Sequence, residues 1–266
     1  MDDLTAKYEQ LRAVLGRLDS LIVAYSGGVD SALLLCVAYK VLGSKVLAVT
    51  ADSPSVPRRE LTEARRIAQT IGARHLVMAT EEIRDGNYAA NPANRCYFCK
   101  SELYSKLAEI ARREKIRYVA NGTNLDDLGD YRPGLQAAAE YQVVSPLKEA
   151  GLTKADVREL AKQLHLEIWD KPASPCLASR IPYGQAVTPQ KLAAVETAEE
   201  YLRGLGICEL RVRYFGRKAR IETRGSDFAV IQKNYEHIVE RFNALGFEEI
   251  ELKEFRSGAL NSCSIF

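Results

Sequence analysis

Short apolar runs alternate with amphipathic stretches through the first two thirds of the chain. The apolar runs have the length of buried strands, and they cover residues 21–25, 46–50, 75–79, 118–120 and 143–147. Between them, apolar residues recur at helical spacing over residues 4–18, 32–42, 57–71, 101–111 and 154–164. Alternation of strands and helices is typical of a parallel sheet with helices on both faces. We therefore predict an α/β fold with a doubly wound parallel sheet.

The pattern changes after residue 187. A helix over 188–203 is followed by strands at 209–214 and 218–223 with a turn between them, then by a helix over 226–244 and a strand at 249–254. This order predicts a small α+β domain with an antiparallel sheet. The stretch before it is rich in proline and has no periodicity. We therefore expect three parts: an α/β domain (1–170), an active-site loop (171–187) and a smaller α+β C-terminal domain (188–266).

Residues 26–31, Ser-Gly-Gly-Val-Asp-Ser, stand between the first strand and the following helix. Adjacent glycines let the backbone turn tightly, and N–H groups of the turn and of the helix start then form an anion pocket. Ser26 and Ser31 add hydroxyl donors, and Asp30 is placed to hold Mg²⁺. A glycine pair alone would be a hairpin or linker. In this context the hexapeptide resembles the pyrophosphate loop (PP-loop) of the ATP pyrophosphatases, and the Walker sequence is absent.

Further polar residues follow the other predicted strands. The carboxyl ends of parallel strands share one edge of a sheet, where ligands bind. Gly122 permits a close backbone approach, and Asn124 and Asp127 offer ribose or metal contacts, although a capped helix start is the alternative. Together with the pyrophosphate-loop resemblance, this predicts an ATP site formed by Ala24, Ser26, Gly27, Gly28, Asp30, Ser31, Ala51, Gly122, Asn124 and Asp127.

Composition narrows the class of protein. The chain has 266 residues, of which 47% are hydrophobic and 27% charged, and its formal net charge is +2. These are values of an ordinary globular protein, and they favour neither a nucleic-acid nor a membrane partner. The first residues lack the features of a signal peptide, so we expect a cytoplasmic protein. In that reducing compartment, the six cysteines indicate metal binding or catalysis rather than disulfides.

Three cysteines have the setting of metal ligands. Cys96 and Cys99 are three residues apart at the start of a predicted helix, so both thiols face one side and thiolate is favoured. Cys176 lies in the proline-rich loop. Three thiolates can hold three irons of a [4Fe–4S] cluster and leave the fourth open. A zinc ion with three cysteines and water is the alternative, and Cys176 can also be a packed loop residue.

Arginines on the predicted hairpin form a second possible anion site. Arg211 and Arg213 alternate with apolar residues, so they share one face of their strand. Arg256 follows the last predicted strand and is a possible neighbour of the hairpin. A solvated face is the simplest interpretation of such a pair. Because guanidinium groups suit phosphates, the three arginines, if brought together, would make a monophosphate site distinct from the ATP site.

With these motifs in view, the chain resembles the LarE family, ATP-dependent sulfur transferases of nickel-pincer nucleotide cofactor biosynthesis. The most specific piece is Ser-Pro-Cys-Leu-Ala-Ser-Arg-Ile-Pro-Tyr-Gly at residues 174–184. The resemblance implies that ATP adenylates a carboxylate of pyridinium-3,5-biscarboxylic acid mononucleotide, and that a sulfur nucleophile then displaces AMP. It also implies that Asp30 and Cys176 are catalytic, that Asp30 holds Mg²⁺, and that the substrate phosphate is bound by Arg211, Arg213 and Arg256.

Members of that family obtain sulfur in two ways. In one group a single cysteine, matching Cys176, gives up its own sulfur and becomes dehydroalanine, so the protein acts once. This sequence also has Cys96 and Cys99, and it is similar to the three-cysteine members, in which a [4Fe–4S] cluster carries an added sulfide. We therefore expect the cluster type. Glu196 or Glu200 on the following helix could assist proton transfer near Cys176, although a solvated helix face explains both equally well.

Other functions fit part of the pattern. A tRNA thiolation enzyme also uses a pyrophosphate loop, but it would need clustered Lys and Arg for phosphate-backbone binding. An amide synthetase would leave the cysteines without a role, and a nucleotide sensor would bind ATP without releasing pyrophosphate. As partners we expect the pyridinium mononucleotide and a sulfide source, no membrane, no nucleic acid, and a second copy of the chain in a homo-oligomer.

Overall fold

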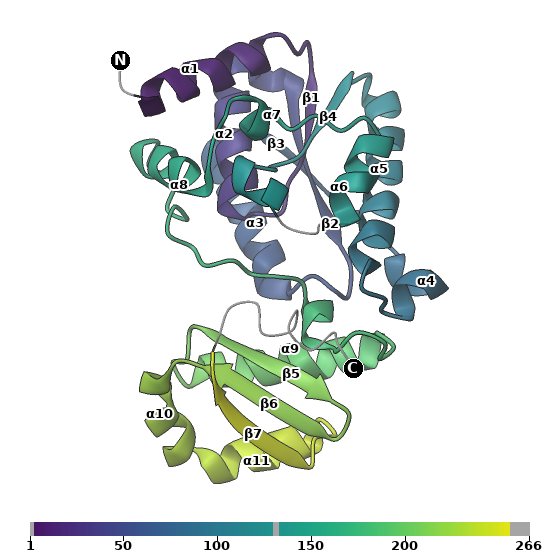
Figure 1. The fold of residues 1–266 in the computed structure, drawn as a ribbon, viewed down its shortest axis with the longest axis vertical. Coiled ribbons are helices and arrows are strands. Elements are labelled where there is room, and N and C mark those ends of the chain that lie inside the picture. Colours follow the sequence, from purple (N-terminus) through teal and green to yellow (C-terminus); the bar gives the residue numbers. More distant parts are fainter. Residues whose placement is uncertain (1–2, 130–132, 256–266) are drawn as a thin grey trace. The chain divides into compact units, whose positions relative to one another are not determined.

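The computed structural model describes residues 3–129 and 133–255, so Arg256 lies outside the described residues. The chain divides into two units (Figure 1). Unit 1 comprises residues 1–88 and 94–174, and unit 2 comprises residues 89–93 and 175–266. The five-residue contribution of 89–93 to unit 2 was not anticipated, because so short a stretch carries no hydrophobic periodicity.

Unit 1 contains a four-stranded sheet in the order β3–β2–β1–β4. The strands are β1 (Leu21–Ala24), β2 (Val46–Asp52), β3 (Arg74–Ala79) and β4 (Tyr118–Ala120), and each pair is parallel. The chain first adds β2 and β3 on one side of β1, and then adds β4 on the other side. The strand order therefore reverses between β1 and β4, and open α/β sheets bind ligands beside such a reversal.

Both faces of this sheet are covered, which confirms the predicted doubly wound fold. Leu21 and Val23 of β1 pack into one core cluster with side chains of α1, α2 and α8, whereas Ile22 packs into a second cluster with α5 and α6. Successive strand residues point to opposite faces, so a continuous apolar run is what such a strand requires. The helices up to residue 163 are α1 (Asp3–Gly16), α2 (Val29–Leu42), α3 (Arg58–Ile71), α4 (Gly86–Ala89), α5 (Arg95–Glu114), α6 (Pro133–Glu140), α7 (Pro146–Glu149) and α8 (Lys154–Gln163).

The strand predicted over 143–147 is wrong. Val144 forms one isolated parallel bridge with Ala120, and α7 begins at Pro146 directly afterwards. Proline has no N–H for a ladder but fits the first turn of a helix, so the apolar run ends after a single pairing.

Unit 2 contains a three-stranded sheet in the order β5–β6–β7. The predicted hairpin is present as β5 (Leu210–Phe215) and β6 (Lys218–Thr223), which are antiparallel, whereas β7 (Glu249–Glu254) runs parallel to β6. The sheet is therefore mixed rather than antiparallel as predicted. The cause is the connection, because α10 (Phe228–Lys233) and α11 (Tyr235–Ala244) carry the chain back before β7 starts.

The core of unit 2 lies between this sheet and its helices. α9 (Pro189–Gly204) contributes Ala198 and Leu202, which pack with Val212 of β5 and Phe242 of α11. The predicted single helix over 226–244 is divided at Asn234 between α10 and α11.

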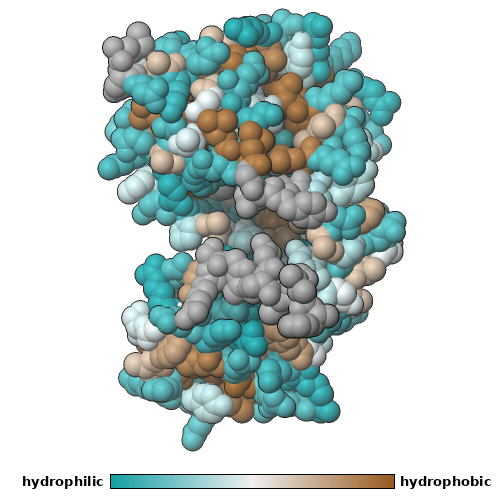
Figure 2. Space-filling view, in the orientation of Figure 1, coloured by the Kyte–Doolittle hydropathy of each residue, from teal (hydrophilic) through white to brown (hydrophobic). Residues whose placement is uncertain are grey.

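On the face shown in Figure 2, most exposed side chains are hydrophilic. Across the described residues, no helix combines the length and the apolar character needed to span a membrane.

Candidate functional site

The loop after β1 is closed by its own two serines. Ser31 Oγ donates to the carbonyl of Gly28 at 3.0 Å and accepts from the backbone N–H of Ser26 at 3.2 Å. The Gly28 N–H donates to Ser26 Oγ at 3.3 Å. Gly27 has a φ of 76°, which a glycine adopts at little cost. The serine hydroxyls that the sequence suggests as phosphate donors thus also hold the loop in shape.

α2 starts directly from this loop. Gly28 occupies its N-cap position, and no side chain caps the helix. The first N–H groups of a helix have no partner within the helix, and the helix dipole adds positive potential there. The local structure therefore directs backbone N–H groups of the first turn of α2 toward a position where an anion such as a phosphate is favoured.

The loop after β4 meets the loop after β1. A Cβ at Gly122 would lie 2.9 Å from the backbone N of Ser31 and 3.1 Å from the carbonyl carbon of Asp30. Such contacts are too short for any side chain, so only glycine allows this approach. This approach of one backbone segment to another lies beside the reversal of strand order between β1 and β4, and the role of Gly122 at a ligand stays a prediction.

Asp30 is the centre of a hydrogen-bond network at this junction. Its Oδ1 accepts from Asn124 Nδ2 at 3.0 Å, and its Oδ2 pairs with Lys154 Nζ at 2.5 Å. Asn124 is held in turn, because its N–H donates to Asp127 Oδ2 and its Oδ1 accepts from the N–H of Asp126. The structure thus brings together Asp30, Asn124 and Asp127 from the predicted site.

Lys154 is part of the site but was missed in the sequence. A usable signal exists: Thr153 is a recognisable helix cap, which places Lys154 in the first turn of α8, where the helix dipole disfavours a cation. Because a lysine at this position does not stabilise the helix, its presence suggests a role in the site.

The strand ends behind the loop are fixed by a small polar group. Thr50 Oγ1 donates to the carbonyl of Tyr25 at 2.8 Å and lies 2.8 Å from His75 Nε2. Because the hydroxyl proton is used on Tyr25, His75 donates to Thr50 Oγ1 from Nε2. Burial, and then the nearby charge of Arg65, lower the pKa of His75, which keeps it neutral. Of the remaining predicted ATP residues, Ala24 ends β1 and Ala51 lies near the end of β2.

Cys96 and Cys99 are the second and fifth residues of α5, so both lie at the start of a helix, as predicted. Cys96 is exposed and Cys99 is partly buried. Burial raises the pKa of the Cys36 thiol in α2, so that cysteine is not suited to be a thiolate ligand. Cys176 belongs to unit 2. Within residues 3–129 and 133–255, no three His, Cys, Asp or Glu side chains are grouped so as to hold a metal ion.

The turn that carries Cys176 is held by a buried arginine. Cys176 precedes a 3-10 helix, Leu177–Arg180, and Arg180 donates from Nη1 to the carbonyls of Pro175 at 2.8 Å and Cys176 at 3.3 Å. Its other nitrogens pair with both carboxylate oxygens of Glu199, at 2.9 and 3.2 Å. The side chains of Arg180 and Glu199 are only 3% and 4% exposed, so this is a fully buried ion pair.

Glu199 is the buried acid of α9 near this turn, whereas Glu196 is partly buried and Glu200 exposed. Oε1 of Glu199 also accepts from the backbone N–H of Val212 in β5 at 3.0 Å. The sequence contains the signal, because Glu199 falls at helical spacing from the apolar Val195 and Leu202.

Arg211 and Arg213 differ in their surroundings. Arg213 is 2% exposed, and it pairs with Glu222 at 2.9 Å and donates to the carbonyl of Ser179 at 2.9 Å. Arg211 stacks on Phe255, with its guanidinium carbon 4.6 Å from the ring centroid. Burial, and then the nearby guanidinium groups of Arg180 and Arg213, lower the pKa of Arg211. The carboxylates of Glu222 and Glu199, which pair with Arg213 and Arg180, act in the opposite direction.

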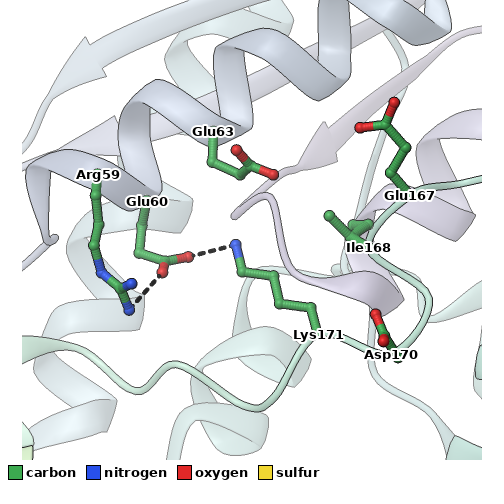
Figure 3. A pocket seen from close by; sticks show the side chains of 7 residues that line it. All are labelled: Arg59, Glu60, Glu63, Glu167, Ile168, Asp170 and Lys171. Carbon is green, nitrogen blue, oxygen red and sulfur yellow. Dashed lines mark hydrogen bonds and ion pairs between the residues drawn. The ribbon is translucent and has the colours of Figure 1, made fainter. Parts of the chain in front are cut away.

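A polar pocket of about 370 Å³ lies between α3 and the segment after α8 (Figure 3). Lys171 pairs there with Glu60 at 2.8 Å. Arg158 of α8 donates to the carbonyls of Trp169 and Lys171, so the chain leaves unit 1 from a fixed position. The pocket is lined by Arg59, Glu60, Glu63, Glu167, Ile168, Asp170 and Lys171.

Comparison with known proteins places the chain in a family. Residues 9–115 match the sequence profile of NAD synthase. An uncharacterised protein of Synechocystis sp. is 46% identical over 262 residues, which cover 97% of this chain and 98% of that protein. An uncharacterised protein of Methanocaldococcus jannaschii is 32% identical over 243 residues, with 89% and 91% covered. Pyridinium-3,5-bisthiocarboxylic acid mononucleotide synthase of Lactiplantibacillus plantarum is 38% identical over 267 residues, with 98% and 96% covered. The chain therefore belongs to the family of that synthase.

Proposed function

We propose that this protein is an ATP-dependent sulfur transferase that converts the carboxylates of pyridinium-3,5-biscarboxylic acid mononucleotide into thiocarboxylates. The observation that carries the proposal is the Asp30 network at a pyrophosphate loop, in a chain that is similar over nearly its whole length to a synthase of the bisthiocarboxylic acid product. The reaction would use the backbone pocket of unit 1 and the Cys176 turn of unit 2.

The first step activates the carboxylate. A carboxylate is a poor electrophile, so its oxygen attacks the α-phosphorus of ATP and pyrophosphate leaves, which gives an acyl adenylate. Backbone N–H groups of the loop and of the first turn of α2 would stabilise the charge on the departing pyrophosphate. The carboxylate oxygens of Asp30 suit Mg²⁺, which would neutralise phosphate charge when bound.

The second step replaces AMP by sulfur. A sulfur nucleophile adds to the acyl carbon, the bond to AMP breaks, and a thiocarboxylate remains. Arg211 would bind the phosphate of the mononucleotide, supported by Arg213 and by Arg256, while Arg180 holds the Cys176 turn. No oxidation state changes in this exchange when the donor is sulfide, so no external reductant is needed.

Cys96, Cys99 and Cys176 are the proposed ligands of a [4Fe–4S] cluster. Thiolates are the right donors for iron, and two of the three lie in one helical turn. The third ligand, Cys176, belongs to unit 2. Residues 89–93 also belong to unit 2, and α5, which contains Cys96 and Cys99, begins two residues after them. When bound, the cluster would supply sulfide for the exchange and make repeated turnover possible.

Removal of Cys96 is expected to prevent cluster formation. After anaerobic reconstitution, the wild-type protein should contain about four irons and an equal amount of acid-labile sulfide per chain, and Cys96→Ala should contain almost none. Cys208→Ala removes an exposed cysteine of unit 2 and should keep the wild-type iron content. Iron analysis and electron paramagnetic resonance make the measurement.

A wild-type protein without iron would contradict the cluster. Sulfur would then come from Cys176, through a thioester with the substrate and β-elimination. Mass spectrometry should in that case find dehydroalanine at position 176 after one turnover.

The proposed substrate class is tested by release of pyrophosphate from ATP. Release should depend on the pyridinium dicarboxylate mononucleotide, and it should be absent with transfer RNA or with ammonia and a simple carboxylic acid. Release that depends on transfer RNA would instead support a thiolation enzyme.

A further inference from the structure

We propose that Lys154 binds the pyrophosphate part of ATP, and that in the nucleotide-free protein Asp30 holds its ammonium group in place. The inference rests on the proposed use of ATP. It adds a positively charged phosphate ligand to a loop that contains no lysine or arginine.

The first support is the position of the ammonium group. Lys154 Nζ lies 2.5 Å from Asp30 Oδ2, although the two residues are 124 positions apart in the chain. Their side chains are 36% and 26% exposed, so both can be reached by a ligand. Partly exposed ion pairs contribute little to stability, so holding α8 against α2 is a weak reason for this pair.

The second support is the fixed backbone below the side chain. Thr153 and Asp156 form a complete capping box at the start of α8. Lys7 of α1 pairs with the same Asp156 at 3.0 Å, and the N–H of Lys154 donates to Asp126 Oδ2 at 2.9 Å. The stem of Lys154 therefore starts from a well-defined point, while its four-carbon chain stays free to turn.

The third support is that Lys154 and Asp30 both lie in electrostatically unfavourable positions when no ligand is bound. A cation in the first turn of a helix opposes the helix dipole, and Lys154 is the first residue of α8. A carboxylate at the start of α2 makes the pocket less attractive to phosphate. Each residue becomes favourable once a divalent cation binds Asp30, because the ammonium group is then released toward the phosphate anion.

The charges of Asp30, Lys154 and a bound Mg²⁺ favour pyrophosphate over AMP as the group that Lys154 binds. Asp30 and Lys154 cancel one another, so the pair alone does not attract an anion. With Mg²⁺ on Asp30, the same residues have a net positive charge that matches a multiply charged anion. AMP has no β- or γ-phosphate, so its binding should not depend on Lys154.

The test compares ligands that contain or lack these phosphates. Isothermal titration calorimetry in the presence of Mg²⁺ would measure binding of pyrophosphate, AMP, and an ATP analogue with methylene between the α- and β-phosphates. Lys154→Met should weaken the analogue and pyrophosphate about 10- to 100-fold, the range of one charge-assisted hydrogen bond, and leave AMP within about twofold. Lys154→Arg should weaken binding of the analogue and of pyrophosphate less than Lys154→Met does.

Lys162→Met is the matched control, because Lys162 lies on the exposed side of the same helix and its removal changes the net charge equally. It should bind all three ligands as the wild type does. Unchanged binding of the analogue by Lys154→Met, or an equal loss for AMP, would overturn the assignment. If the wild-type protein binds neither AMP nor the analogue, the proposed use of ATP fails, and the role of Lys154 fails with it.

Discussion

Replacement of Gly27 by alanine is expected to lower the free energy of unfolding of unit 1 by about 2–5 kcal/mol. Two costs combine here. The residue has a φ of 76°, which disfavours any side chain. A Cβ would also lie 2.8 Å from the Cβ and 3.0 Å from the Cα of Ala64, so the backbone of α3 or the loop must move. Because the moving loop carries the anion pocket, ATP binding should weaken roughly tenfold or more.

Gly151→Ala separates the two costs. Gly151 also belongs to unit 1 and has a φ of 72°, but a Cβ there would meet nothing within 4 Å. Gly151→Ala should therefore lower the free energy of unfolding by only about 1–2 kcal/mol and leave nucleotide binding unchanged. Urea unfolding followed by the fluorescence of Trp169, the single tryptophan, makes the comparison within unit 1. Equal losses in the two variants would contradict the close packing of the loop against α3.

Removal of Arg180 is the second large expected effect. Arg180→Met removes the nearest cationic partner of the buried Glu199 carboxylate, which keeps only a longer ion pair with Arg203 at 3.7 Å, and the carbonyls of Pro175 and Cys176 lose a donor. Breaking a buried ion pair from one side costs about 3–5 kcal/mol. Hydrogen exchange with mass spectrometry should show faster exchange in unit 2, most strongly in the peptide that contains Cys176, and sulfur transfer should fall with it.

Two further variants make this prediction specific. Arg180→Met combined with Glu199→Gln removes both charges and still leaves an acceptor for the N–H of Val212. It should recover part of the lost stability, because the penalty comes from a buried carboxylate whose closest cation is gone, although the longer pair with Arg203 is lost as well. Arg224→Met breaks an exposed pair with Glu209 in the same unit and should cost about 0–1 kcal/mol. A double variant less stable than Arg180→Met would contradict the account.

The fold of unit 1 was largely predictable because its signals are local. The apolar run before Ser26, the glycine pair and the apolar helix after it determine strand, turn and helix in that order. Thr153 likewise marks the start of α8. Prediction failed where distant pairing decides the structure. The run over 143–147 has the composition of a strand but makes one bridge, and nothing within 249–254 indicates that β7 runs parallel to β6.

The site was predictable residue by residue but not as a network. The sequence places Asp30 and Asn124 at the ends of elements, and the sheet topology then brings them within 3.0 Å of each other. Lys154 joins them through a contact across 124 residues, which no local pattern contains. Asn91 is a similar case. It is fully buried with a φ of 57°, and its amide donates to three carbonyls of residues 181–185, yet its neighbours in sequence show no motif.

Sulfur transfer itself is the most direct test of the account. The protein would be incubated with MgATP, sulfide and pyridinium-3,5-biscarboxylic acid mononucleotide, and the products followed by mass spectrometry. The account predicts a product in which oxygen is replaced by sulfur, with one AMP and one pyrophosphate formed for each exchange. AMP and pyrophosphate without any sulfur-containing product, or a complete lack of ATP cleavage in the presence of this substrate, would contradict it.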